Sequence, residues 1–191
     1  MARDDPGLPA VLKRPQISLL GTVDEMMLQS LAEQLGNLPD GRDPVALELT
    51  TLGGDAELGR RAMLDIQEAR ARLQPRRFVF LGKTVVYSAG LTLMSGFPRE
   101  DRYLAADAVL LIHCRQLEQD LKLSGPLRSS LPLLRAKCHE LETGIRLEEE
   151  AFENLIAGSQ VTMDEVLEKG LYNWYVPAEE AVKLELVAGI A

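Results

Sequence analysis

The stretch FVFLGKTVVYSAGLTLMSG, which occupies residues 78–96, decides the fold class of this chain. It opens on an apolar run at residues 78–81 that is rich in aromatic and branched side chains, as in a buried strand. From Ser88 to Gly96 the residues are small and apolar, which favours a buried helix. A strand that leads into a buried helix is the unit of an α/β fold, so this stretch predicts that class.

The alternation of strand and helix extends along the chain in both directions. Strands are predicted at residues 17–20, 45–50 and 108–112, and the last is apolar throughout, as in a parallel strand covered on both faces. A capping box at Thr22-Val23-Asp24-Glu25 predicts a helix start, and another helix follows Gly53-Gly54-Asp55. The apolar stripes of these helices are Met27, Leu28, Leu31 and Leu35, then Leu58, Ala62, Ile66, Ala69 and Leu73.

The C-terminal part of the chain has a different pattern. Residues 126–157 form a long charged helical stretch, in which we expect the acidic run Glu148-Glu149-Glu150 to be a solvated face. The apolar positions beside that run need cover, so this helix is predicted to project from the core and pack against a partner. A second capping box at residues 162–165, an extended segment at 171–176 and a final helix after Pro177 complete the chain.

Length and composition exclude several classes of protein. The chain has 191 residues, a net charge of −8 and 46% apolar residues, which indicates one globular domain and argues against a nucleic-acid-binding surface. Residues 1–15 carry several Pro and Gly, so we expect a flexible N-terminal arm before a single domain at 16–191. No apolar run reaches the roughly 18 residues of a membrane span, and the first residues do not resemble a signal peptide. We therefore expect a cytoplasmic protein, with Cys114 and Cys138 as reduced thiols.

Three features fall beyond the carboxyl ends of predicted strands, where open α/β sheets place their sites. They are Gly53-Gly54, Ser88 and His113. Each alone has an ordinary structural explanation: the glycines form a tight turn, the serine caps a helix, and the histidine is a hydrogen-bonded core residue. Together they supply the hydroxyl nucleophile, the imidazole base and the amide donors that acyl transfer requires. The glycines match neither the dinucleotide nor the Walker pattern, and no cofactor or metal is expected.

Four motifs occur in the order Leu52-Gly53-Gly54, Tyr87-Ser88-Ala89-Gly90, Ile112-His113 and PAEEAV at residues 177–182. They resemble the Ser-Pro-Gly-Gly turn, the Ala-Ser-Met-Gly nucleophile segment, the Met-Ile-His motif and the Ser-Ala-Glu-Glu-Ala-Val motif of one family. That family is the proteolytic subunit of the Clp protease, a serine peptidase on a crotonase-like ββα spiral. His113 follows Ser88 by 25 residues, as it does in the family, and the resemblance runs from about Arg14 to the C-terminus.

The resemblance implies the role of each site residue. Ser88 is the nucleophile, His113 is the general base, and the amides of Gly54 and Ala89 form the oxyanion hole. The family's catalytic aspartate falls at Asn173, which can accept a hydrogen bond but cannot stabilise imidazolium by charge. Asp107 and Asp120 are alternative acceptors. His139 lies among charged residues of the long helix, where we expect a solvated role.

The resemblance also implies an assembly. Family members stack two rings of subunits through a protruding helical handle, which corresponds to residues 126–157 here, and enclose their sites in a chamber. The N-terminal segment is shorter than the family's, which argues against docking to an ATPase unfoldase.

The leading hypothesis is a serine endopeptidase that cleaves peptides or unfolded proteins inside a homo-oligomeric chamber. An alternative is a catalytically silent homologue that acts as an assembly or regulatory subunit. A weaker option is acyl-CoA chemistry on the same spiral.

Overall fold

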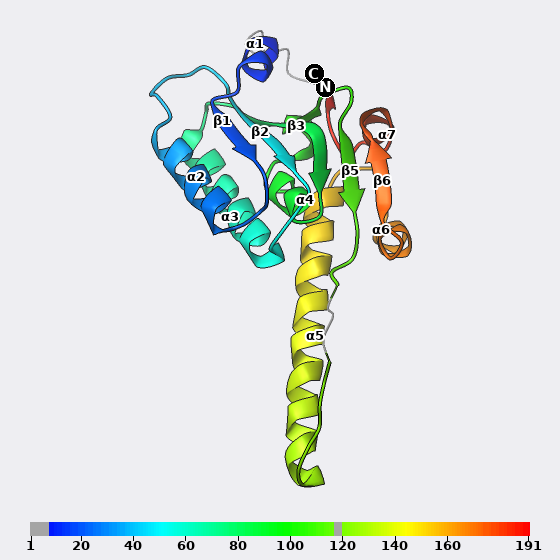
Figure 1. Cartoon of the computed structure of the whole chain (residues 1–191). Coiled ribbons are helices and arrows are strands. Elements are labelled where there is room, and N and C mark those ends of the chain that lie inside the picture. The colour runs from blue at the N-terminus through cyan, green and yellow to red at the C-terminus, as the bar shows by residue number, and fades with distance from the viewer. Residues whose placement is uncertain (1–7, 117–119) are drawn as a thin grey trace.

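The computed structural model describes residues 8–116 and 120–191 of the chain (Figure 1). The strands are β1 (Ile17–Leu20), β2 (Val45–Thr51), β3 (Phe78–Tyr87), β4 (Arg102–Leu104), β5 (Val109–Ile112), β6 (Trp174–Pro177) and β7 (Gly189–Ile190). The helices are α1 (Leu8–Lys13), α2 (Glu25–Gly36), α3 (Ala56–Leu73), α4 (Ala89–Met94), the 3₁₀ helix η1 (Arg99–Asp101), α5 (Leu127–Ile156), α6 (Met163–Gly170) and α7 (Ala178–Lys183). This is the mixed α/β architecture that the sequence predicts.

Strand β3 organises the sheet because it has different partners along its length. The sheet order is β1-β2-β3-β4-β7, all parallel, while β5 pairs with β3 and, in the antiparallel sense, with β6. Residues 80–82 of β3 pair with β4, and residues 85–87 pair with β5. Between these two parts Thr84 has a φ of 57°, and the pairing with β2 shifts register. This irregularity in β3 lets the strand pair with β4 in its first half and with β5 in its second half. The second half leads to Ser88.

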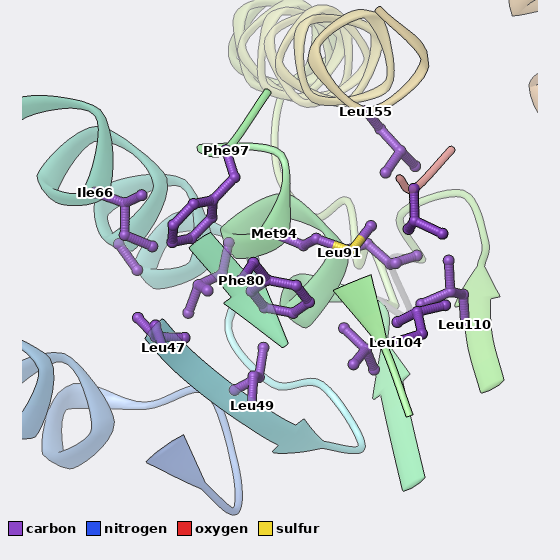
Figure 2. Close-up of a cluster of buried hydrophobic side chains, with 14 of the residues drawn as sticks. Leu47, Leu49, Ile66, Phe80, Leu91, Met94, Phe97, Leu104, Leu110 and Leu155 are labelled. Carbon is purple, nitrogen blue, oxygen red and sulfur yellow. The ribbon is translucent and has the colours of Figure 1, made fainter. Parts of the chain in front are cut away.

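The main core lies between the sheet and helices α3 and α4 (Figure 2). Leu47 and Leu49 from β2, Phe80 from β3 and Met94 from α4 are fully buried there. Helix α4 is buried along most of its length, as the small apolar sequence of residues 88–96 predicts. The start of α4 is therefore held in place by close packing rather than by solvent-exposed contacts.

The opposite face of the sheet corrects one expectation. A flexible arm is predicted over residues 1–15, but residues 8–13 form helix α1. Val11 and Leu12 of that helix are buried in a second cluster with Ala46, Val79 and Leu81. Side chains alternate between the two faces of a strand, so β2 and β3 present apolar groups on both sides and the second face needs cover. Residues 1–7 lie outside the described part of the chain.

Helix α2 begins later than its capping box predicts. Asp24 rather than Thr22 is the N-cap, and its carboxylate accepts from the Met27 amide at 2.9 Å. Val23 forms a parallel bridge with Gly54, and its amide donates to the Gly53 carbonyl at 2.9 Å. This tertiary contact keeps Val23 extended and delays the helix. At α6 the predicted cap is confirmed, since Thr162 accepts from the Glu165 amide at 3.2 Å.

Helix α5 projects far beyond the body of the molecule (Figure 1), as predicted for residues 126–157. It contains 30 residues and is about 45 Å long at 1.5 Å per residue. Apolar side chains recur along it at alternating steps of four and three residues, the spacing of a coiled-coil seam. We use the term seam for Leu127, Leu131, Leu134, Cys138, Leu141, Ile145, Glu148, Phe152 and Leu155. Its C-terminal end, with Phe152 and Leu155, is buried in the body, whereas Leu127 is 88% exposed.

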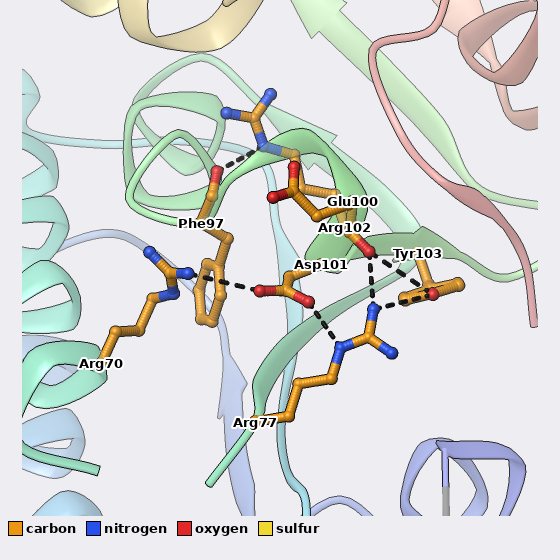
Figure 3. A network of polar contacts seen from close by, with 7 residues as sticks. All are labelled: Arg70, Arg77, Phe97, Glu100, Asp101, Arg102 and Tyr103. Carbon is orange, nitrogen blue, oxygen red and sulfur yellow. Dashed lines mark hydrogen bonds and ion pairs between the residues drawn. The ribbon is translucent and has the colours of Figure 1, made fainter. Parts of the chain in front are cut away.

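A buried arginine attaches α5 to the body. Arg102 is 1% exposed and donates to the carbonyls of Asn154 at 2.9 Å and Leu155 at 2.6 Å, in the last turn of α5. It also donates to the Phe97 carbonyl at 2.8 Å (Figure 3). Burial lowers the pKa of Arg102 to about 10, so the guanidinium is still charged at neutral pH. Beside it, Asp101 accepts from Arg70 and Arg77 (Figure 3).

None of the helices in the described ranges combines the length and the apolar character that a bilayer crossing demands.

Candidate active site

Ser88 stands at the junction of β3 and α4 in a backbone conformation that few non-glycine residues adopt. Its φ is 54° and its ψ is −119°. Its amide donates to the Leu111 carbonyl at 3.0 Å, which ties this junction to β5. The hydroxyl does not cap the helix, so the structural explanation of this serine as a helix cap does not hold. Strained backbone of this kind recurs at catalytic residues and leaves the hydroxyl free for chemistry.

The glycine turn after β2 lies directly against Ser88. A Cβ atom added at Gly53, where φ is 103°, would lie 2.8 Å from Ser88 Cβ and 3.3 Å from Ser88 Oγ. Only glycine fits this close approach. The Gly53 amide donates to Thr51 Oγ1 at 3.0 Å, which orients the turn.

A cavity of about 370 Å³ joins the predicted site residues. Ser88, His113, Gly54 and Ala89 all line it. Within residues 8–116 and 120–191, the amides of Gly54 and Ala89 have no hydrogen-bond acceptor. Two unpaired amides beside a serine hydroxyl form the arrangement of donors that an oxyanion needs.

His113 follows the last residue of β5 and is half-buried. Its Nδ1 lies 2.7 Å from the Cys114 carbonyl oxygen. A carbonyl can only accept, so Nδ1 carries a proton, and in the neutral imidazole Nε2 is the nitrogen that can act as a base. In the described part of the chain no hydrogen bond joins His113 to Ser88 or to Asn173.

Asn173 lies just beyond the end of the antiparallel pairing of β5 with β6. Ile112 pairs with Trp174, and the next residues outward on the two strands are His113 and Asn173. Asn173 has a φ of 62°, is exposed and does not line the cavity. Tyr87 and Tyr175 stack edge to face at 5.8 Å, which holds β6 beside the β3 end that leads to Ser88.

The two alternative acceptors do not contact His113 in the described residues. Asp107 precedes β5, at the opposite end of that strand from His113. Asp120 is exposed. His139 is also exposed, with Nδ1 at 3.1 Å from Glu142 Oε2, as its predicted solvated role requires.

Sequence reasoning missed two charged residues in the cavity wall, Arg115 and Glu148. Glu148 was expected on a solvated face, but it is only 8% exposed. The reason is its place in the seam, four residues before Phe152 and seven before Leu155, where α5 enters the body. The seam spacing is the signal that distinguishes Glu148 from its exposed neighbour Glu149.

The two charged residues are linked through the backbone. The Arg115 amide donates to Glu148 Oε2, and the Arg115 guanidinium is paired with Glu57 at 2.6 Å. Burial raises the pKa of the neighbouring Cys114 thiol, and the charge of Glu148 raises it further. This thiol is therefore protonated at neutral pH and is a poor nucleophile. Among the described residues, no cluster of three or more His, Cys, Asp or Glu is arranged to hold a metal ion.

Comparisons with known proteins give matches in three-dimensional structure but not in sequence. No protein-family model and no curated protein sequence matches the chain. Among solved structures, the chain is similar to a ClpP1 mutant from Listeria monocytogenes in which an asparagine is replaced by aspartate. The TM-score is 0.68 with 16% identity, over 96% of this chain and 94% of that chain. The chain therefore has the fold of ClpP, the proteolytic subunit of the Clp protease, which its sequence motifs predict.

Proposed function

We propose that this chain is a serine endopeptidase of the Clp type, with Ser88 as nucleophile and His113 as general base. The observation that carries the proposal is the conformation of Ser88, whose strained backbone presents an uncapped hydroxyl to a cavity shared with an imidazole. The unpaired amides of Gly54 and Ala89 in the same cavity support it. The ClpP-like fold is consistent with this class of enzyme.

The proposed reaction divides peptide hydrolysis into two steps. Ser88 Oγ attacks the scissile carbonyl carbon, and its proton passes to His113 Nε2. The Gly54 and Ala89 amides donate to the oxyanion, and the imidazolium then protonates the leaving amine as the C–N bond breaks. Water, deprotonated by His113, hydrolyses the acyl-enzyme, releases the acid and restores the serine hydroxyl.

Ser88 and His113 must approach each other for this reaction. Both follow paired strands, since Tyr87 pairs with Leu111, and His113 comes two residues after Leu111. The reaction requires His113 Nε2 within hydrogen-bond distance of the hydroxyl, and we expect substrate in the cavity to favour this approach, because catalytic hydrogen bonds often tighten only in the complex. Asn173 is proposed as the orienting residue because both it and His113 adjoin the last pair of β5 with β6, Ile112 and Trp174.

The proposed assembly is a homo-oligomer built through α5. Between Leu127 and Ile145 the seam is exposed in the single chain, and apolar area of this kind is expected to be covered by another copy. The substrates are proposed to be peptides or unfolded segments that enter the chamber. A cytoplasmic location, with both cysteines reduced, belongs to the same proposal.

The test is labelling with a fluorophosphonate probe, read by intact mass and peptide mapping. We expect one adduct on Ser88 of the oligomer and none on Ser88→Ala, because only an activated hydroxyl displaces fluoride from phosphorus. Ser95→Ala is the control, since Ser95 is buried and bonded to the Thr92 carbonyl. A folded oligomer that takes no label would contradict the peptidase and favour an assembly or regulatory subunit.

A further inference from the structure

The charge of the cavity wall points to the substrate specificity of the site. This inference rests on the proposed peptidase activity. Two side chains of fixed charge line the cavity, Arg115 and Glu148. The Arg115 guanidinium is already neutralised by Glu57 at 2.6 Å. Within the described ranges, Glu148 has no cationic side chain within 4 Å, and its hydrogen-bond donors are the Arg115 amide and the Cys114 thiol, which are both neutral. The wall therefore has one excess negative charge.

That charge is in an unusual place on α5. Glu148 is the one charged member of the seam, and every other seam position has an apolar residue or a cysteine. It is buried to 8% exposure, where a carboxylate without a cationic partner is costly. The Arg115 amide and the Cys114 thiol each donate to Glu148, but neither group is charged, so neither balances the charge of the carboxylate.

The groups around Glu148 define what could occupy the cavity. Ala151, Phe152 and Leu155 follow it on the same face of α5 and line the cavity with Leu91 and Thr92. An occupant thus meets apolar walls and a single carboxylate. A lysine side chain has this pattern, because its aliphatic stem buries against apolar groups while its ammonium seeks an anion. Arginine has the same charge on a stem of similar length.

We propose that Glu148 sets the substrate specificity of this site by binding a lysine or arginine side chain at the residue whose carbonyl Ser88 attacks. That side chain enters the cavity beside the nucleophile, with its carbonyl toward the amides of Gly54 and Ala89. The substrate class is accordingly a basic peptide or a basic unfolded segment. The carboxylate of Glu148 selects against glutamate and aspartate at this position of the substrate, since like charges repel in a buried site.

The experiment uses peptidyl diphenyl phosphonates, which react once with an activated serine and need no turnover. The probes differ only in the side chain next to phosphorus: lysine, norleucine or glutamate. Norleucine matches the lysine stem without its charge. The full-length oligomer is assayed, and the second-order rate of Ser88 modification is followed by intact mass.

We expect the lysine probe to react about tenfold or more faster than the norleucine probe, because an ion pair in a partly buried site is only partly offset by desolvation. Glu148→Gln keeps the hydrogen bond from the Arg115 amide, and should bring the two rates to within about threefold. Glu148→Asp keeps the charge and should retain a preference for lysine. Glu149→Gln removes a neighbouring exposed carboxylate and should leave the ratio unchanged.

Each other outcome overturns the proposal in a recognisable way. A lysine preference that survives Glu148→Gln would place the selectivity elsewhere. A preference for norleucine would show an apolar pocket, and a preference for glutamate would assign the selectivity to Arg115. If a simple fluorophosphonate labels Ser88 but no lysine preference exists, the specificity fails and the peptidase stands. If no phosphonate reacts with Ser88, both fail together.

Discussion

At the scale of single residues, the site combines strain at Ser88 with an ordinary hydrogen bond at His113. The φ of 54° at Ser88 is maintained by the surrounding packing, since the Gly53 turn, β5 and the buried helix α4 all contact this junction. His113 is held by a neutral acceptor, the Cys114 carbonyl. A neutral acceptor fixes the tautomer but gives little stabilisation to the imidazolium that forms during acyl transfer.

Asn173→Asp tests whether residue 173 orients the His113 imidazole. We expect turnover of a peptide substrate to rise by about tenfold or more, because a carboxylate accepts from Nδ1 and also stabilises imidazolium by charge. The loss of that charge in a serine-protease triad costs about 10⁴ in turnover. The measurement is kcat for a fluorogenic peptide, with Asn173→Ala as the second variant.

If Asn173→Asp leaves kcat unchanged or lowers it, residue 173 does not orient the base. An Asn173→Ala variant with full activity would then assign the orienting role to the Cys114 carbonyl alone.

The Cys114 thiol gives a pH-dependent prediction that does not depend on catalysis. Burial, and then Glu148, raise its pKa, so the thiolate that reacts with iodoacetamide forms only at higher pH than in the unfolded chain. We expect the alkylation rate of Cys114, mapped by mass over about pH 7 to 10, to have its midpoint shifted upward relative to urea-unfolded protein. Glu148→Gln should reverse part of that shift, since burial remains.

An identical midpoint in folded and unfolded protein would contradict the burial of Cys114. An identical midpoint in wild type and Glu148→Gln would mean that Glu148 carries no negative charge beside the thiol.

At the scale of secondary-structure elements, the fold depends on how the long helix meets the body. The last carbonyls of a helix have no partners within it. In α5 the carbonyls of Asn154 and Leu155 are satisfied by Arg102, which comes from β4 and also reaches the Phe97 and Leu186 carbonyls. One side chain thus joins the handle, β4 and the C-terminal segment.

Arg102→Met tests this junction. We expect the free energy of unfolding to fall by about 3 kcal/mol, because methionine fills similar space but leaves several buried carbonyls without a donor. The measurement is urea denaturation followed by circular dichroism. Arg72→Met, at an exposed position of α3, should change the free energy of unfolding by less than about 0.5 kcal/mol.

An Arg102→Met protein as stable as wild type would mean that apolar packing compensates for the lost donors. That is the known outcome when some buried charges are replaced by hydrophobic side chains.

At the scale of the whole molecule, the single chain leaves a long apolar stripe uncovered. Leu131, Leu141 and Ile145 are 51%, 45% and 55% exposed, and they lie on the part of the seam where α5 extends away from the sheet (Figure 1). The heptad-like spacing is suited to packing against another helix.

A double variant, Leu141→Glu with Ile145→Glu, tests whether this surface holds copies together. We expect wild type to sediment as an oligomer at micromolar concentration and the double variant to dissociate, since two carboxylates would have to be buried at the contact. Arg135→Glu changes the net charge by the same two units outside the seam and should remain assembled. Analytical ultracentrifugation gives the masses, and circular dichroism verifies that the dissociated chain is folded.

A wild-type protein that is monomeric at that concentration would contradict assembly through the seam. Equal dissociation by Arg135→Glu would show that charge, rather than the apolar surface, controls the association.

Much of this architecture follows from the sequence alone. The spacing of apolar residues, together with Gly, Pro and capping residues, predicts β1, β2, β5, the buried helix α4 and the long helix α5. Local patterns of apolar residues encode which face of an element is buried. The order and spacing of Gly53-Gly54, Ser88 and His113 also predict that the ends of the strands bring them together, and Gly54, Ser88 and His113 line one cavity.

Only the tertiary structure decides the rest, because it depends on contacts between segments far apart in the chain. The two partners of β3, the cover that α1 supplies to the second face of the sheet, and the carbonyl that holds His113 belong to this class. Glu148 belongs to it most clearly. The two acids that follow it, Glu149 and Glu150, are exposed and half-buried. Glu148 becomes part of the cavity wall because the C-terminal end of α5 packs into the body beside Ser88 and His113.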